Sequence, residues 1–369
     1  MPVWAGLISC KAEPKKRGVS IVPILRQEPL TGEWVIVATE RARRPETFAP
    51  AKKVKKDPLP ARVESCPFCP GNEHMTPPEV LVYRGDFQRQ HANDPDVLNA
   101  DWSVRIIPNK FPALEQRLDG EQLDGRVPDR WNFFQNFTGY GVHEVIIETP
   151  DHNRQLADLS VEELILVLRS FKERLWELSK DPRLQYVQIF RNHRREAGAS
   201  IEHPHGQLIA LPYIPPLLEK EYRRSREYYD EKGRCLLCTL LEEEEKTGER
   251  VVLSNEFFLA YIPFAAPLPF TTWIVPRQHV SSLEKGPEGW EERLAPLLKS
   301  FMTLLSDKLD DPPYNMYFHL APLRSRERPD FHWHLEIIPK LTIVAGLEMA
   351  TGTFINVSRP EEAAQFIRE

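Results

Sequence analysis

The same order of sequence segments occurs twice along this chain. Each series begins with a C-x-x-C pair, continues through an N-x-F segment and a strand-like stretch that closes on a histidine, and ends with a helix-like stretch, a second strand and an H-x-H pair. The spacing between the last two landmarks agrees as well, with 51 residues from His152 to His203 and 53 from His279 to His332. Agreement in order and spacing indicates an internal repeat, which constrains the fold before any single element does.

A long helix is predicted in each copy. In the first copy, Ser160 and Glu163 form a capping-box pattern, and the apolar residues after them occupy one broad helical face. The second copy has a similar pattern over residues 289–309, with Pro296 near its start. Runs rich in β-branched and aromatic residues predict strands at 34–38, 144–148 and 273–276. The predicted fold class is therefore α+β, with two repeats fused in one chain, each an antiparallel sheet with a long helix.

The junction between the copies is predicted near residues 227–234. This divides the chain into an N-terminal domain, 1–225, and a C-terminal domain, 226–369.

The charge balance limits the partners of the protein. The chain has 54 acidic and 48 basic residues, a net charge of -6, so a general nucleic-acid-binding surface is not expected and any phosphate site has to be a local pocket. The longest apolar run near the start, residues 3–9, is too short to span a membrane and no basic leader precedes it. We expect a cytoplasmic protein with no nucleic-acid and no membrane partner.

Four of the 5 cysteines fall in the two C-x-x-C pairs. In a reducing compartment such a pair indicates metal binding or redox chemistry before a disulfide. A redox pair is expected at the start of a helix in a βαβ unit, and neither pair follows an obvious buried strand. The pairs therefore favour zinc.

The segment His203-Pro204-His205-Gly206-Gln207 carries the strongest local signal. On an extended strand, alternate side chains share a face, so His203, His205 and Gln207 point the same way. From these residues alone, three interpretations remain open: a polar strand face, a pair of metal ligands, or a nucleophile with a hydrogen-bond donor beside it.

The loop before this segment favours an anion site. Residues 192–200 contain Gly198 and Ser200, which offer backbone N–H groups and a hydroxyl to an anion, while Arg194 and Arg195 either add charge or are solvated. A neutral histidine can attack phosphorus without first losing a proton, provided that its other ring nitrogen is held as N–H. Gln207 can then donate to a phosphate oxygen as charge shifts.

Together, H-P-H-G-Q, the preceding N-x(5)-G-x-S, the C-P-F-C pair and the early segment PLTGEWVIVATERARRPETF closely resemble the galactose-1-phosphate uridylyltransferase family, the double-repeat branch of the histidine-triad superfamily. The resemblance extends from about Arg26 to Phe354. It implies that His205 is the nucleophile that becomes a nucleotidyl-histidine and that a homodimer builds each active site. It also implies a substrate-binding set composed of Gln207, Asn192, Gly198, Ser200, Arg41, Arg44 and the nucleoside-contacting Asn109.

The resemblance also assigns metal ligands. In the first repeat it implies a closed zinc site formed by Cys66, Cys69, His152 and His203. For the second metal, the repeat predicts Cys235, Cys238, His279 and His332, whereas another branch of the family implies Glu221, His319, His332 and His334. We favour the first set because thiolates bind zinc strongly, although the second metal could be iron. The second repeat has His334 and Glu336 where the first has His205 and Gln207, and a carboxylate there would repel a phosphate, so we expect this copy to be silent.

The substrates are less constrained than the chemistry. We predict a UDP-glucose–hexose-1-phosphate uridylyltransferase that acts by a ping-pong reaction on nucleotide-sugar and sugar-1-phosphate substrates, as H-P-H-G-Q favours. The segment around Gly346 and Glu348 resembles instead ADP-glucose phosphorylase-like members, in which inorganic phosphate is the acceptor. Glu348 is predicted to hydrogen-bond sugar hydroxyls or, alternatively, to be a surface residue. A zinc-based binding module is the remaining alternative.

Overall fold

The computed structural model describes residues 22–38, 59–84, 88–90, 102–116, 138–325 and 327–369. Its main feature is an 11-stranded sheet in which neighbouring strands run antiparallel. From edge to edge the strands are β4 (Gln88–Gln90), β3 (Leu81–Arg84), β5 (Val104–Pro108), β6 (Val142–Ile147), β8 (His205–Leu211), β7 (Tyr186–His193), β12 (Tyr314–His319), β13 (His334–Pro339), β11 (Thr272–Pro276), β10 (Phe258–Tyr261) and β9 (Val251–Ser254).

The strand order shows how the two repeats are joined. The first repeat contributes strands in the spatial order β3-β5-β6-β8-β7. Counted outward from the junction, its order β7-β8-β6-β5-β3 corresponds strand by strand to β12-β13-β11-β10-β9 of the second repeat. The two halves meet where β7 pairs with β12, in a register that places Asn192 opposite Asn315 and Phe190 opposite Tyr317. The α+β class and the two sheet-bearing repeats are confirmed, but their strands form one continuous sheet, which the sequence pattern did not predict.

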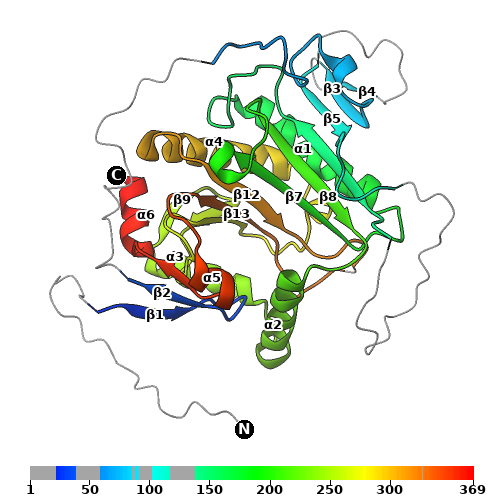
Figure 1. Ribbon diagram of the computed structural model, residues 1–369. Helices are drawn as coiled ribbons and strands as arrows, with labels where there is room; N and C mark the ends of the chain where they lie inside the picture. The colour runs from blue at the N-terminus through cyan, green and yellow to red at the C-terminus, as the bar shows by residue number, and fades with distance from the viewer. Residues whose placement is uncertain (1–21, 39–58, 85–87, 91–101, 117–137, 326) are drawn as a thin grey trace.

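One face of this sheet is covered by the two predicted long helices, α1 (Val161–Leu178) and α4 (Trp290–Leu309), which pack against each other (Figure 1). The capping box at the start of α1 is confirmed, since the Ser160 hydroxyl accepts from the Glu163 N–H and the Glu163 carboxylate accepts from the Ser160 N–H. The apolar face of α1 is buried against Leu208 and Ala210 of β8 in one core that includes α4. Because strand side chains alternate, His205 and Gln207 lie on the opposite face.

On that opposite face, the half that belongs to the second repeat is covered. Helix α2 (Pro216–Lys232) projects at the bottom of the view, and α3 (Leu236–Thr247) follows it (Figure 1). Apolar residues of α3 and Leu30 pack on Tyr261 and Trp273 of the sheet. The remaining short 3-10 helices are η3 (Glu73–Met75), η5 (Arg195–Ala197) and η6 (Leu283–Lys285).

A small second sheet ties the two ends of the described chain together. It has the order β1-β2-β14, from β1 (Ile24–Gln27), β2 (Trp34–Val37) and β14 (Phe354–Asn356), and β14 runs parallel to β2. Helices α5 (Gly346–Thr351) and α6 (Pro360–Arg368) flank β14. Strands β1 and β2 thus lie in one sheet with β14, which comes from the second repeat, and helix α2 spans residue 225. The domain boundary at residue 225 stays a prediction. None of the helices in the described ranges has the length and apolarity needed to cross a lipid bilayer.

The capping box should contribute measurably to the stability of the fold. We expect Ser160→Ala to lower the free energy of unfolding by about 1 kcal/mol, because it leaves an N-terminal N–H of α1 without its acceptor. Ser300→Ala is the matched control: among the described residues, its exposed hydroxyl bonds to the Pro296 carbonyl in the middle of α4 and to no other group, so its effect should stay within about 0.5 kcal/mol. Denaturant unfolding measures both, and equal losses would contradict a specific role for the cap.

Candidate functional site

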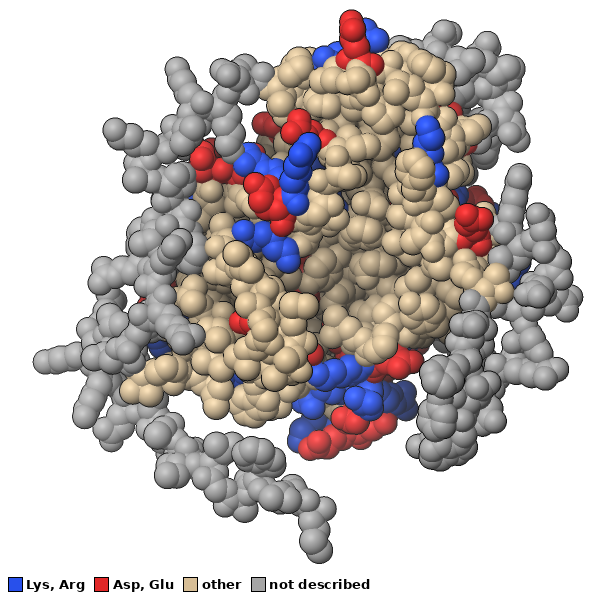
Figure 2. All heavy atoms as spheres, viewed as in Figure 1, with Lys and Arg blue, Asp and Glu red and all other residues tan. Residues whose placement is uncertain are grey.

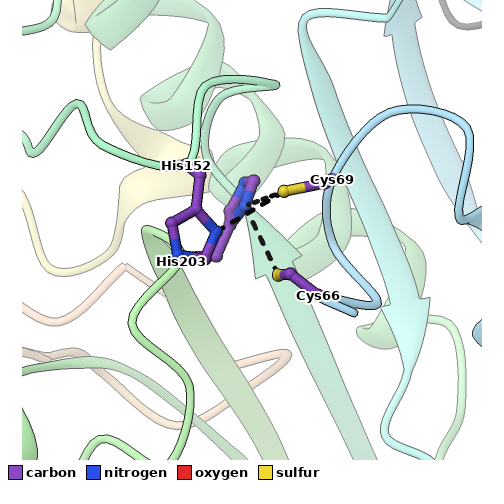
Figure 3. A group of neighbouring side chains, drawn as sticks. All are labelled: Cys66, Cys69, His152 and His203. Atoms are coloured by element: carbon purple, nitrogen blue, oxygen red, sulfur yellow. Dashed lines mark hydrogen bonds between the residues drawn. The ribbon is translucent and has the colours of Figure 1, made fainter. Parts of the chain in front are cut away.

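The first metal-type cluster lies at the beginning of β8 (Figure 3). Cys66 and Cys69 come from the loop before β3, His152 follows β6, and His203 precedes β8; all four are buried, and their ligand atoms lie within 4.8 Å of one another. Burial raises the pKa of the Cys66 thiol to about 11 and lowers the pKa of His203 to about 4. A cation at the centre would favour the thiolate and the neutral imidazole that such a site requires.

The distances in this cluster fit a tetrahedral zinc ion. His203 Nδ1 lies 3.8 Å from Cys66 Sγ and 3.6 Å from Cys69 Sγ, and His152 Nδ1 lies 3.4 Å from Cys69 Sγ. Tetrahedral zinc with ordinary bond lengths separates sulfur and nitrogen ligands by about 3.6 Å. The other ring nitrogen of His203, Nε2, donates to the Thr149 carbonyl at 2.8 Å, which leaves the Nδ1 lone pair for a metal.

The second cluster repeats this arrangement in the other half of the sheet. Cys235, Cys238, His279 and His332 converge in the same way, with Cys238 Sγ 3.4 Å from Nδ1 of each histidine. His279 Nε2 donates to the Arg328 carbonyl at 2.9 Å. The structure therefore places His332 with the cysteines rather than with the alternative glutamate set.

The alternative set is present as a separate cluster of three residues. Glu221, His319 and His334 are buried, and their ligand atoms also lie within 4.8 Å of one another. His319 Nδ1 contacts Glu221 at 2.9 Å, and His334 Nε2 contacts Glu336 at 3.1 Å. Burial disfavours the charged imidazole of His319, but the charges of Glu221 and Glu336 outweigh it and raise its pKa to about 9. His332 takes no part in this cluster, so the two predicted sets do not compete for it.

His205 lies two residues beyond the first cluster, on β8. Its Nδ1 lies 2.8 Å from the His203 carbonyl, which can only accept a hydrogen bond, so Nδ1 carries the proton and Nε2 keeps its lone pair. Burial lowers the pKa of His205 to about 4, which keeps the ring neutral at pH 7. Phe68 packs edge-on against the ring at 5.4 Å between centroids. This is the arrangement that a neutral nitrogen nucleophile needs.

The predicted anion-binding loop lies at the end of β7, next to β8. Asn192 is the seventh residue of β7, the short helix η5 follows, and Gly198 has φ +97°, a conformation that favours glycine. A Cβ atom at position 198 would lie 3.4 Å from Asn192 Nδ2. Because glycine has no Cβ, the amide nitrogen of Asn192 stays accessible from the loop. Ser200 is exposed, and so is Arg195, whereas Arg194 pairs with Asp311.

Gln207 has a partner that sequence reasoning missed. The Ala113 N–H donates to His143 Nδ1 at 3.1 Å, so the His143 proton is on Nε2, which lies 2.9 Å from Gln207 Oε1. The Gln207 NH₂ group is therefore free to donate elsewhere. Asn109 Nδ2 lies 3.1 Å from the same His143 nitrogen, a contact between two donors rather than a hydrogen bond. His143 could have been identified as the partner of Gln207 only from the register of β6 against β8, which the sequence does not give.

The remaining predicted residues are not gathered here. Arg41 and Arg44 lie outside the described residues. Glu348 lies in α5, where its carboxylate accepts from the Ala345 N–H at 3.1 Å, so within this chain it caps a short helix beside the small sheet. On the face drawn in Figure 2, lysine, arginine and acidic side chains of the described residues are intermingled, in one group at the bottom over α2 and in another at the upper left, rather than separated into a basic area.

Comparisons with known proteins agree with this geometry. Sequence models of the N-terminal and C-terminal domains of galactose-1-phosphate uridyl transferase match residues 19–215 and 221–366. The chain is 34% identical to ADP-glucose phosphorylase of Arabidopsis thaliana, over 94% of this chain and 93% of that protein. It is 32% identical to galactose-1-phosphate uridylyltransferase of Thermotoga maritima, over 94% and 98%.

Solved structures give the same relationship. The crystal structure of the Arabidopsis thaliana ADP-glucose phosphorylase with bound ADP-glucose superposes with a TM-score of 0.76 at 32% identity, covering 94% of this chain and 98% of that one. A structure of a uridylyltransferase superposes with a TM-score of 0.68 at 28% identity, covering 94% and 97%. With both of its halves matched in order, this chain belongs to the galactose-1-phosphate uridyl transferase family.

Proposed function

We propose that this protein is a nucleotidyltransferase that uses His205 as its nucleophile. One observation carries the proposal: the His203 carbonyl holds the proton of His205 on Nδ1, and among the described residues nothing hydrogen-bonds to the Nε2 lone pair. Gln207 follows on the same strand face, with its NH₂ group left free by His143. A neutral ring nitrogen next to amide hydrogen-bond donors is suited to attack the phosphorus of a nucleotide phosphate, because the donors can stabilise the charge on the phosphate oxygens.

In the proposed first half-reaction, His205 Nε2 forms a bond to the α-phosphorus of a nucleoside diphosphate hexose. The bond from that phosphorus to the bridging oxygen breaks, and hexose 1-phosphate leaves with the electron pair. In the second half-reaction, an oxygen of the acceptor phosphate attacks the same phosphorus, and the phosphorus–nitrogen bond breaks to restore neutral His205. Gln207, Asn192 and Ser200 supply donors for the phosphate oxygens in both steps.

For substrates we propose UDP-glucose and a hexose 1-phosphate, the pair expected of a galactose-1-phosphate uridylyltransferase. The His203–Gln207 motif and the relative from Thermotoga maritima support this pair. A second candidate is phosphorolysis of ADP-glucose, with inorganic phosphate as acceptor. It is supported by the 34% identity to the Arabidopsis thaliana phosphorylase and by the 0.76 TM-score to its ADP-glucose complex. The chemistry at His205 is the same in both.

The two Cys₂His₂ clusters are proposed to hold one metal ion each, zinc in the first and zinc or iron in the second. Four protein ligands leave no open position, so these ions would supply structural stability rather than a reactive water. In the second repeat, the counterpart of Gln207 is Glu336, whose carboxylate already contacts His334 and Tyr317 and is buried. This supports a catalytically silent second repeat.

Assembly and location are also proposals. We propose a homodimer in the cytoplasm, in which Arg41, Arg44 and Glu348 complete the nucleotide and sugar sites. Within one described chain, Glu348 lies in α5, which packs against β14 of the small sheet. Thiolate ligands in two metal-type clusters fit a reducing compartment.

Metal analysis tests the two clusters separately. We expect about two metal ions per chain in the wild type, one in Cys66→Ser and one in Cys235→Ser. Cys66→Ser should also lower the midpoint of thermal unfolding, because structural zinc binding contributes to folding. Cys10→Ser, which changes the cysteine outside both pairs, is the control and should keep both ions. A wild-type content of one ion or fewer would remove the second site, and three would assign an ion to the Glu221 cluster.

Steady-state kinetics test the covalent step. If the nucleotide passes through His205, double-reciprocal plots of rate against donor at several acceptor concentrations should give parallel lines. The measurement is made with UDP-glucose and galactose 1-phosphate, and again with ADP-glucose and inorganic phosphate; the pair with the higher kcat/KM identifies the substrates. Intersecting lines with both pairs would mean direct transfer in a ternary complex.

Chemical rescue separates the two histidines of the motif. We expect His205→Gly to keep its metal content and fold but to lose transfer between substrates, since the nucleophile is gone. A preformed uridylyl- or adenylyl-imidazolide should fill the hole and transfer its nucleotide to the acceptor. His203→Gly should not be rescued, because it removes a ligand of the first cluster and the anchor of β8. Rescue of His203→Gly alone would show that the roles are reversed.

A further inference from the structure

Asn315, on β12 of the second repeat, reaches the anion-binding loop of the first. The register of β7 and β12 places it directly opposite Asn192, with both side chains on the His205 face of the sheet. Its amide nitrogen, Nδ2, donates to Asn192 Oδ1 and to the backbone carbonyl of Ala197, each at 2.8 Å. No motif of the first repeat includes this residue.

These two bonds determine which end of the Asn192 amide faces the loop. A backbone carbonyl only accepts, so the nitrogen end of Asn315 has to face Ala197. The second hydrogen on that nitrogen then points at Asn192, which has to accept it through its side-chain oxygen, Oδ1. Asn192 Nδ2 is thereby turned to the other side, where it lies 3.4 Å from the position that a Gly198 side chain would take.

The orientation matters because an amide can present either a donor or an acceptor. With its nitrogen toward the loop, Asn192 offers N–H groups to a phosphate; rotated by half a turn, it would offer an oxygen and repel the anion. A donor aimed before the reaction needs no reorganisation as charge develops.

A second contact from the same element holds the loop itself. Arg194 has φ 67° and ψ 164°, a region that residues other than glycine rarely adopt and that its surroundings have to maintain. Asp311, just before β12, pairs with the Arg194 guanidinium and lies 2.8 Å from His193 Nε2. The second repeat thus contacts the loop at Arg194 through Asp311 and at Ala197 through Asn315.

We propose that Asn315 is a positioning residue for nucleotidyl transfer: it acts through Asn192, whose N–H groups it directs to the phosphate. The inference rests on the proposed function and deepens it, since it assigns the second repeat a part in the chemistry of the first. Asn315 itself needs no contact with the substrate.

A double-mutant cycle tests whether Asn315 acts through Asn192. In single-turnover measurements of nucleotidyl-enzyme formation, Asn315→Ala should slow the step roughly 10- to 100-fold, with little change in the KM for the donor. In an Asn192→Ala background, Asn315→Ala should have almost no further effect. Multiplicative losses would show that the two residues act independently and would overturn the inference.

Gln188→Ala is the matched control. Gln188 also lies on β7 and its side-chain amide also bonds across the junction, to the Phe318 carbonyl at 2.9 Å, but four residues away from Asn192. Its rate should equal that of the wild type; a loss like that of Asn315→Ala would mean that any amide lost from the junction slows the reaction. Asn315→Asp, which cannot donate to Asn192, should lose at least as much as Asn315→Ala, and a near-normal rate would overturn the inference.

Neutron diffraction of the wild-type protein reads the orientation without activity. The deuterons of Asn192 should lie toward Gly198, and deuterons facing Asn315 would overturn the inference. A wild type that forms no nucleotidyl-enzyme from any donor overturns the proposed function, whereas a normal wild-type rate with independent losses in the cycle overturns only the role of Asn315.

Discussion

His203 takes part in two interactions that together determine the reacting end of β8. Its ring joins Cys66, Cys69 and His152 in a buried cluster that fits a tetrahedral ion, and its carbonyl accepts the Nδ1 proton of His205. The first interaction fixes where the strand begins, and the second fixes the tautomer of the next histidine. If the cluster were lost, both the place of His205 and the availability of its Nε2 would change, so metal binding and nucleophile geometry are coupled through one residue.

The continuous sheet extends this dependence to the second repeat. Because β7 pairs with β12, the loop that follows β7 lies against residues of the other half, and Asp311 and Asn315 contact it. At the position that corresponds to Gln207, the second repeat has the buried carboxylate of Glu336, and its residues Asp311 and Asn315 contact the loop of the first repeat. The second repeat thus contributes strands to the common sheet and side chains to the junction with the first.

Much of this arrangement could be predicted from the sequence, because it depends on local patterns. The long helices follow from periodicity, the Ser160 cap from its spacing to Glu163, and the strand at 144–148 from its β-branched residues. The repeat relates the two Cys₂His₂ sets. The sequence did not reveal the joining of the sheets, the presence of both second-repeat sets as separate clusters, or the roles of His143 and Asn315. Each of these depends on which residues face one another across strands that are distant in the chain. The register of such strands cannot be read from local sequence patterns.

The central claim is that His205 becomes covalently nucleotidylated. The most direct measurement is the mass of the intact protein after brief incubation with UDP-glucose or ADP-glucose in the absence of acceptor, followed by peptide mapping. We expect a mass increase of one uridylyl or one adenylyl group, located on His205, that disappears when the matching acceptor is added. An unchanged mass with both donors, or an adduct on any other residue, would contradict it.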